Sequence, residues 1–306
     1  MDFWTWYDEA RQQAIEQRVP GGELDWLLVE WAGIDRLTLR LRDGKIQLQV
    51  SLEQLDRLWQ QRLIDRVPVQ YLAGVVGWRN FRLHVSPAVL IPRPETELII
   101  DLAGELTAVH HQLRRGIWVD LGTGSGAIAL ALAEMMPEAV IWAIDRSAAA
   151  LEIAELNVLR IGLEKQIQFA QGDWFAPLAQ LAGHIAGMVS NPPYIPSAEV
   201  LALDPEVTQH EPHSALDGGS DGLDCLRHLV EAAPHYLMPG GLWLVELMAG
   251  QAPAVMDLLR ANGHYCNIAA HRDLAGIDRF VSAQYHPRDR PPLPKAPVPR
   301  DNRKVI

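Results

Sequence analysis

The run Ser-Asn-Pro-Pro-Tyr at residues 190–194 combines side chains and rigidity suited to holding a planar amide or amine. It follows an apolar run at 185–189 that predicts a buried strand, so it should lie at that strand's carboxyl end. Two prolines keep the backbone extended and remove two N–H donors, which leaves nearby carbonyls free to accept. We expect the Asn191 side-chain oxygen and the Pro192 carbonyl to accept both hydrogens of an NH₂ group, with Tyr194 across its plane. An ordinary Asn-Pro turn after a strand also fits these residues.

A second group of candidate binding residues is the glycine-rich turn Gly122-Thr123-Gly124-Ser125-Gly126, which follows a predicted strand at 117–120 and precedes a predicted helix. Glycines let the backbone approach a ligand closely at a helix N-terminus. Asp145 ends the next predicted strand, at 140–144, where an acid can accept hydrogen bonds from ribose hydroxyls. The same spacing satisfies a loose dinucleotide-binding pattern, so a nicotinamide enzyme is the main competing interpretation.

Asp120, two residues before the first glycine, distinguishes a dinucleotide site from an S-adenosylmethionine site. An acid at this position can hold the positively charged amino-acid end of S-adenosylmethionine, directly or through water, and it would repel a pyrophosphate. We therefore predict S-adenosylmethionine as the ligand. Asp173 and Trp174 follow a predicted strand at 167–170, and we expect them to border the adenine as an acceptor and an aromatic face. Hydrophobic capping of the sheet is the alternative for Trp174.

The elements that position these residues alternate between strand and helix from residue 115 onward, which predicts βα units of a parallel sheet. The remaining expectations are a helix over 148–159, a loop over 195–222, a helix over 223–237, a strand over 242–246, a helix over 252–261 and a strand pair near 266–270 and 279–284.

The sequence before this region predicts a different organisation. Helical periodicity over 3–66 indicates a small helical domain whose tryptophans favour core packing over a partner surface. A hairpin is expected between 75 and 91, followed by a proline-rich connector in which Arg93 and Glu95 are available to position substrate or cofactor. The predicted division is a helical substrate-recognition domain at 1–74, hairpin and connector at 75–97, catalytic domain at 98–285 and a disordered, proline-rich basic tail at 286–306.

Composition limits the function further. The 306 residues hold 27 Lys and Arg against 38 Asp and Glu, a net charge of -11 that argues against broad binding of nucleic acid. Cys225 and Cys266 have neither a pairing motif nor metal-ligand spacing, so no metal site is expected. The sequence shows no export signal and no apolar run long enough for a membrane span. We expect a cytoplasmic monomer that does not bind membranes and acts on a discrete partner.

The motifs in this order resemble the class I methyltransferases and, within them, the release factor glutamine methyltransferase family. The resemblance covers about residues 1–284. It is carried by Ile91-Pro92-Arg93-Pro94-Glu95-Thr96, by residues 120–126, by Asn191-Pro192-Pro193-Tyr194, by Glu211-Pro212 and by Asp217-Gly218-Gly219-Ser220-Asp221-Gly222. The chain departs from the family at Met248, which stands where members often have glycine between the acid at 246 and the glutamine at 251.

The resemblance implies a Rossmann-like, mostly parallel seven-stranded sheet with a small N-terminal helical domain. It implies methyl transfer from S-adenosylmethionine to the glutamine of the Gly-Gly-Gln motif in class 1 peptide chain release factors. Carried over by position, Gly122 to Gly126, Asp145 and Trp174 bind the cofactor. Asn191, Pro192, Pro193 and Tyr194 bind the glutamine, with Asn191 also beside the cofactor and with Asn191, Pro192 and Tyr194 acting in catalysis.

Other functions remain open at this point. A nucleic-acid amino-methyltransferase could hold the exocyclic amine of a flipped base in the same way, although the net charge opposes it. Methylation of a ribosomal-protein glutamine is a related alternative. Two further alternatives are a nicotinamide oxidoreductase and a non-catalytic binding protein that uses the aromatic-rich first 80 residues.

Overall fold

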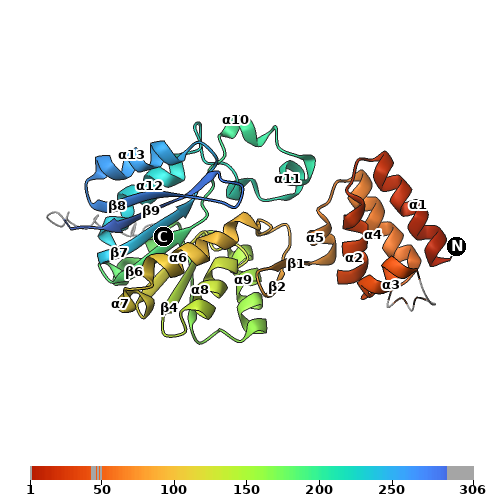
Figure 1. Ribbon diagram of the computed structural model, residues 1–306, viewed down its shortest axis with the longest axis horizontal. Coiled ribbons are helices and arrows are strands. Elements are labelled where there is room, and N and C mark those ends of the chain that lie inside the picture. The colour runs from red at the N-terminus through yellow and green to blue at the C-terminus, as the bar shows by residue number, and fades with distance from the viewer. Residues whose placement is uncertain (1, 43–45, 47, 49, 288–306) are drawn as a thin grey trace, which may run out of the picture.

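The computed structural model describes residues 2–42, 46, 48 and 50–287, and the tail predicted at 286–306 lies almost entirely outside these ranges. The chain runs from a group of N-terminal helices through a two-stranded hairpin into a seven-stranded sheet with helices on both faces (Figure 1). Within the described ranges, no helix has both the length and the apolar character needed to span a bilayer.

The N-terminal helices have their own hydrophobic core. Asp2 caps the first helix by accepting from the backbone of Trp4 and Thr5, and Ser51 and Gln54 form a reciprocal capping box at the start of the fourth. Trp59 is fully buried in this core, which supports a packing role for it. The helices are α1 (Phe3–Glu16), α2 (Gly21–Glu30), α3 (Arg36–Leu41), α4 (Leu52–Ile64) and α5 (Val69–Ala73).

The hairpin joins this helical group to the sheet. Strands β1 (Val75–Trp78) and β2 (Phe81–His84) pair antiparallel around the turn expected at residues 79–80. Trp78 and Leu83 are buried in the same core as one face of the sheet, so the hairpin packs with the sheet. The division of the chain into domains at 74 and 97 stays a prediction.

The sheet has the strand order β5-β4-β3-β6-β7-β9-β8. The first five strands of this order are parallel, and β9 and β8 are antiparallel to their neighbours. This confirms the mostly parallel seven-stranded sheet expected from the sequence. The strands are β3 (Ile117–Leu121), β4 (Val140–Asp145), β5 (Ile167–Gln171), β6 (Ile185–Ser190), β7 (Leu237–Glu246), β8 (Tyr265–Arg272) and β9 (Asp278–Tyr285).

Helices cover both faces of the sheet, which explains why its strands are apolar throughout instead of alternating with polar residues. Trp118 and Leu244 face a core formed with α6, α8 and α9, whereas Val119 and Trp243 face a core formed with α12 and α13. Figure 1 shows these two groups of helices on opposite sides of the strands. The helices are α6 (Leu98–Thr107), α7 (His111–Arg114), α8 (Ala127–Met135), α9 (Ala148–Ile161), α12 (Asp224–Ala232) and α13 (Ala252–Asn262).

Two of the predicted segments were wrong. The expected loop at 195–222 contains α10 (Ser197–Val200) and α11 (Pro205–His210), and α11 begins with a proline, a residue favoured in the first turn of a helix. The helix expected over 223–237 ends at Ala232, because Pro234 has no N–H to continue it, and a 3₁₀ turn follows. Leu237 instead begins β7 and pairs with Ile185.

We expect Gly187→Ala to destabilise the protein, because a Cβ at this position in β6 would lie 2.5 Å from the buried ring of Trp118. Overpacking of this kind costs about 1–3 kcal/mol, to be measured by urea unfolding. Gly77→Ala in β1 is the control, since its Cβ would meet no atom within 4 Å. An unchanged unfolding midpoint for the Gly187 variant would contradict the packing described for β3 and β6.

Candidate active site

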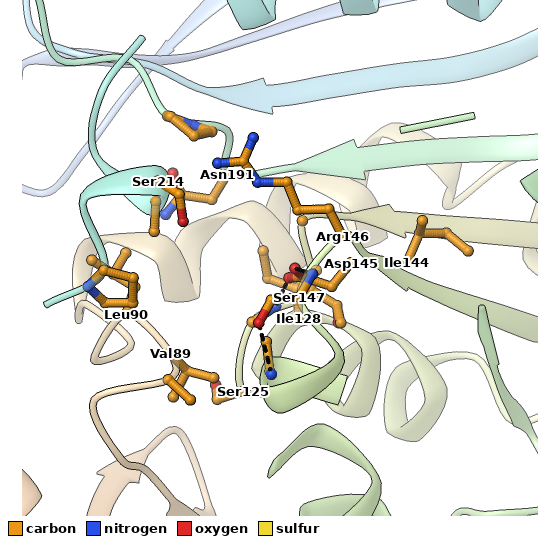
Figure 2. A pocket seen from close by; sticks show the side chains of 18 of the residues that line it. Val89, Leu90, Ser125, Ile128, Ile144, Asp145, Arg146, Ser147, Asn191 and Ser214 are labelled. Atoms are coloured by element: carbon orange, nitrogen blue, oxygen red, sulfur yellow. Dashed lines mark hydrogen bonds between the residues drawn. The ribbon is translucent and has the colours of Figure 1, made fainter. Parts of the chain in front are cut away.

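A cavity of about 450 Å³ lies at the carboxyl ends of β3, β4, β5 and β6. The strand order reverses here, because the chain passes from β3 to β4 and β5 on one side and returns to β6 on the other. Ligands of open α/β sheets bind at this kind of crevice, and the volume is that of a small-molecule site. Figure 2 shows Asn191 and Ser214 on one side of the cavity and Ser125 and Val89 on the other.

The glycine-rich turn after β3 leaves open space beside its backbone. Gly122, Gly124 and Gly126 have φ angles of 77°, 54° and 81°, a region that L side chains rarely adopt. A Cβ on Gly122 or Gly124 would meet no atom within 4 Å, whereas one on Gly126 would lie 3.2 Å from Ala154 of α9. Residues 122–125 line the cavity and Gly126 does not, so the first two glycines face the ligand space and the third allows helix packing.

Asp145 lies at the end of β4, next to this turn. Its Oδ2 accepts from the Gly124 backbone N at 3.0 Å, and its Oδ1 accepts from the Ser147 backbone N at 2.9 Å. A carboxylate oxygen has a further lone pair, so both can still accept from a ligand hydroxyl. The structure therefore brings Asp145 and the glycine turn together around the cavity, as the sequence predicted.

Asp120 is buried beneath the turn and does not line the cavity. Its Oδ2 accepts from Thr123 Oγ1 at 2.6 Å and from the Ala129 backbone N at 3.2 Å, and its Oδ1 has no hydrogen-bond partner. Burial raises the pKa of Asp120 to about 7, against the lowering effect of the Thr123 and Ala129 hydrogen bonds. In this position the carboxyl group holds the turn against the start of α8.

Asp173 and Trp174 follow β5 and both line the cavity. Trp174 has a φ of 50°, and its ring centroid lies 6.2 Å from that of His228. The ring also packs against the core formed with α12 and α13. Trp174 therefore packs against the sheet core and also lines the cavity, and its contact with the adenine stays a prediction.

The four residues of the Asn-Pro-Pro-Tyr motif differ in whether they line the cavity. Asn191 and Pro193 line the cavity, whereas Pro192 is buried and Tyr194 is not among the lining residues. The Asn191 Nδ2 donates to Thr96 Oγ1 at 3.2 Å. The Tyr194 hydroxyl donates to Glu246 Oε1 at 3.0 Å, so this tyrosine anchors the end of the motif on β7.

The segment after β7 is hydrogen-bonded to the Asn-Pro-Pro-Tyr motif. Gln251 Nε2 donates to the Tyr194 carbonyl at 2.8 Å, and the Met248 backbone N donates to Gln251 Oε1 at 3.0 Å. Met248 is not among the described residues with positive φ. The backbone at this position therefore accommodates a side chain, which explains how methionine can replace the glycine often found there.

The proline-rich connector also contributes to the cavity wall. Arg93 Nη2 donates to both carboxylate oxygens of Glu211, at 2.7 and 2.8 Å. Glu211 is 4% exposed, and burial raises the pKa of its carboxyl against the effect of Arg93. Arg93 and Thr96 line the cavity and Glu95 does not. The ion pair joins two motifs recognised separately in the sequence.

Several lining residues were not predicted. Val89 and Leu90 come from the segment after the hairpin, and Ser214 comes from the region expected to be a loop. Arg146 follows Asp145 directly, and its place after the strand end could have identified it. The others carry no local signal, because only the folded connections bring them to the cavity.

Comparisons with known proteins agree with this architecture. The family described as "Methyltransferase small domain" matches residues 98–209. The release factor glutamine methyltransferase of Synechocystis sp. is 53% identical over 92% of this chain and 96% of its own length. The one from Gloeobacter violaceus is 46% identical over 90% of this chain and 94% of its own. The crystal structure of the hMettl16 catalytic domain in complex with an RNA hairpin has a TM-score of 0.54 at 14% identity, covers 82% of this chain and 87% of that one, and shows the fold alone.

The fold and the site define the protein as a class I methyltransferase, an enzyme that uses S-adenosylmethionine as its methyl donor. The chain is 46–53% identical to these two relatives over at least 90% of its length. The chain belongs to the release factor glutamine methyltransferase family, as the resemblance of its motifs indicated.

The cavity fits this methyl donor in size and chemistry. The open sides of Gly122 and Gly124 leave room for a ligand against the backbone. Asp145 offers acceptors for ribose hydroxyls, and Trp174 offers an aromatic surface at the next strand end. Leu90 and Ile128 add apolar lining.

We expect Gly124→Ala to weaken S-adenosylmethionine binding at least about tenfold, because its Cβ would fill ligand space and its φ of 54° would be strained. Isothermal titration calorimetry measures the effect. Gly276→Ala is the matched control, since it has a φ of 79° and an open Cβ direction but does not line the cavity. Equal affinities for the two variants would exclude the turn as the binding surface.

Asp120→Asn tests the burial of this carboxyl. A pKa raised from 3.8 to about 7 means that the folded state holds a proton that the unfolded state releases between these values, so stability is lost as the pH rises through this interval. Asparagine keeps an acceptor for Thr123 and Ala129 and does not ionise. We expect the variant to gain stability relative to the wild type between about pH 4 and pH 7, by at most about 1.4 kcal/mol per pH unit. Urea unfolding at several pH values measures this, and a constant difference would contradict the raised pKa.

Proposed function

We propose that the protein methylates the side-chain amide nitrogen of the glutamine in the Gly-Gly-Gln motif of class 1 peptide chain release factors. The observation that carries this proposal is the orientation of Asn191 beside the glycine turn. Its Nδ2 donates to Thr96, so its carbonyl oxygen remains to accept from a group in the cavity. The names of the relatives point to the same substrate.

The proposed cofactor site consists of the residues at the ends of β3, β4 and β5. Residues 122–126 would hold the cofactor close to the backbone, Asp145 would accept from its ribose, and Asp173 and Trp174 would border its adenine. Asp120 would act from beneath the turn by holding it in place. S-adenosylmethionine, when bound, supplies a methyl group activated by the sulfonium charge.

The chemical difficulty is the weakness of an amide nitrogen as a nucleophile, since its lone pair is delocalised into the carbonyl. If Asn191 Oδ1 and the Pro192 carbonyl accept the two N–H groups, electron density shifts toward the nitrogen and its direction is fixed. Proximity and alignment of this kind can lower a barrier by roughly 7–11 kcal/mol. The ring of Tyr194, anchored through Glu246, would lie across the amide plane. The methylated nitrogen then loses a proton to water.

The helical group at the N-terminus is the proposed recognition domain for the release factor. Arg62 on α4 is 4% exposed and pairs with Glu206 on α11 at 2.8 Å, and Arg66 pairs with the same Glu206 oxygen at 2.8 Å. These ion pairs link the helical group to the segment that carries Glu211. We propose that the protein acts as a monomer in the cytoplasm, where termination of translation occurs, and does not bind nucleic acid directly, in keeping with its net charge of -11.

We expect a purified class 1 release factor, incubated with the protein and S-adenosylmethionine, to gain one methyl group on the glutamine of its Gly-Gly-Gln motif. Mass spectrometry of the proteolysed factor locates it. Asn191→Ala should reduce turnover by at least about a hundredfold, the scale for losing a positioned hydrogen-bonding group, while cofactor affinity changes only a few-fold.

Asn262→Ala is the control, because this asparagine on α13 does not line the cavity. It should keep full turnover. Methylation of RNA or DNA in place of the release factor would overturn the proposed substrate, and a fully active Asn191 variant would overturn the proposed site.

A further inference from the structure

The Asp-Gly-Gly-Ser-Asp-Gly motif at residues 217–222 lies against the backbone that follows Asn191. The Ile195 backbone N donates to the Leu216 carbonyl at 3.0 Å, and the Gly218 backbone N donates to the Ile195 carbonyl at 2.9 Å. These two hydrogen bonds form a short parallel bridge between the two segments. The 217–222 segment is therefore bonded to the chain directly after the Asn-Pro-Pro-Tyr motif.

Glycine at two positions of this segment permits a close approach to the motif itself. A Cβ on Gly218 would lie 2.8 Å from Tyr194 Cα and 2.9 Å from the Pro193 carbonyl oxygen. A Cβ on Gly222 would lie 2.3 Å from the Tyr194 carbonyl oxygen, and the φ of 73° at this glycine also disfavours a side chain. Any other residue at either position would force the two backbones apart.

Two side chains add to the contact between these backbones. Gln251, which is 8% exposed, donates from Nε2 to the carbonyls of Tyr194 at 2.8 Å and Gly222 at 3.3 Å. The Ser197 hydroxyl donates to Asp217 Oδ1 at 2.7 Å. The 217–222 segment is thus joined both to the end of the motif and to the residues that follow it.

These contacts use the carbonyls at the end of the motif and not the one that faces the substrate in the proposed function. The Tyr194 and Ile195 carbonyls each accept a hydrogen bond, whereas none between described residues ends on the Pro192 carbonyl. The Pro192 carbonyl belongs to the peptide unit that ends at the Pro193 ring, and this ring fixes φ at about -65°. A displacement of residues 193–195 is therefore passed on to the Pro192 carbonyl.

We propose that Gly218, Gly222 and Gln251 are positioning residues that fix the direction in which the Asn-Pro-Pro-Tyr motif presents its acceptors. None of these three residues is among those that line the cavity, so they act through the motif and not by contact with the substrate. This inference rests on the proposed function insofar as Asn191 Oδ1 and the Pro192 carbonyl are to receive the two N–H groups of the substrate amide. Misplacement by about 1 Å at a reacting group can lower a rate about a hundredfold.

Gly218→Ala tests the close approach of the two backbones. We expect kcat for the release factor to fall roughly 10- to 100-fold, because the added Cβ would displace Pro193 and Tyr194. The KM for the release factor and the Kd for S-adenosylmethionine should change less than about threefold, since the lost alignment acts in the transition state. Steady-state kinetics and isothermal titration calorimetry measure these effects.

Gly241→Ala in β7 is the matched control. Its Cβ would lie 2.8 Å from the Met238 carbonyl oxygen and 3.0 Å from the Ile185 carbonyl oxygen, a comparable conflict away from the cavity. Neither Gly241 nor Gly218 is among the glycines with positive φ. The control should lose stability in urea unfolding and keep the wild-type kcat. A wild-type kcat in the Gly218 variant, or an equal loss of kcat in the Gly241 variant, would overturn the proposal.

Gln251→Met tests the same contact without adding volume to the backbone interface. Methionine keeps an unbranched side chain of similar length and removes the N–H groups that reach the Tyr194 and Gly222 carbonyls. We expect kcat to fall roughly 10-fold, with the Kd for S-adenosylmethionine again changed less than about threefold.

Gln166→Met is the control for this variant. Gln166 Nε2 also donates to two backbone carbonyls, those of Ala133 at 3.0 Å and Met136 at 2.7 Å, and Gln166 does not line the cavity. It should keep the wild-type kcat. If the Gln251 and Gln166 variants turn over equally fast, the positioning role is excluded even where Gly218→Ala does not fold.

A crystal structure of the Gly218→Ala variant reads the displacement without any substrate. We expect Pro193 and Tyr194 to move away from residue 218 and the Pro192 carbonyl to change direction, with β6 unchanged up to Ser190. A motif that keeps its wild-type position would overturn the inference. If the wild type does not methylate the release factor but the motif moves as expected, the proposed substrate fails and the positioning role stands.

Discussion

A buried hydrogen bond between the ends of two neighbouring strands is the interaction on which the site depends. The Ser190 hydroxyl, at the end of β6, donates to the carbonyl of Leu121, at the end of β3, at 2.6 Å. On the other side of β3, the backbone N–H groups of Gly122 and Thr123 donate to the Ile144 carbonyl at the end of β4. The first residues of three loops are thereby held at one edge of the sheet. The distance between the glycine turn and Asn191 is a consequence of strand pairing and not of loop conformation.

The site gathers buried carboxyl groups that lower the stability of the fold. Asp120 has no basic partner in the described hydrogen bonds and ion pairs, Glu211 has Arg93, and Glu246 lies near Arg279. Burying such groups is costly unless they are paired and hydrogen-bonded. Each of them supports a segment next to the cavity, which explains why they are present in otherwise apolar surroundings. Perturbed carboxyl groups of this kind are typical of functional sites.

The sequence predicted the parts of the site that lie at strand ends. The apolar runs before Asp145 and Asn191 identify strands, and parallel strands place their following residues at a common edge. Sequence alone could not show that Asp120 would be covered by Thr123 and α8 instead of lining the cavity. That outcome depends on how the turn closes over the strand, a tertiary property with no local pattern.

Contacts between distant segments of the chain could not be predicted from sequence patterns either. Arg93 and Glu211 were each noticed in motifs, but their pairing across 118 residues follows from the fold. Thr96 was noted only as the last residue of the connector motif, and its contact with Asn191 spans 95 residues. The two segments that were predicted wrongly each contain a proline at a helix boundary. Pro205 begins α11, whereas Pro234 lies just after the end of α12, because a proline can begin a helix as well as end one.

A crystal structure with S-adenosylhomocysteine and a peptide containing Gly-Gly-Gln would show whether cofactor product and substrate glutamine bind together in one cavity. We expect the ribose at Asp145, the sulfur between the glycine turn and Asn191, and the glutamine NH₂ within hydrogen-bonding distance of Asn191 Oδ1 and the Pro192 carbonyl. A peptide bound outside this cavity, or a glutamine amide turned away from Asn191, would contradict this arrangement.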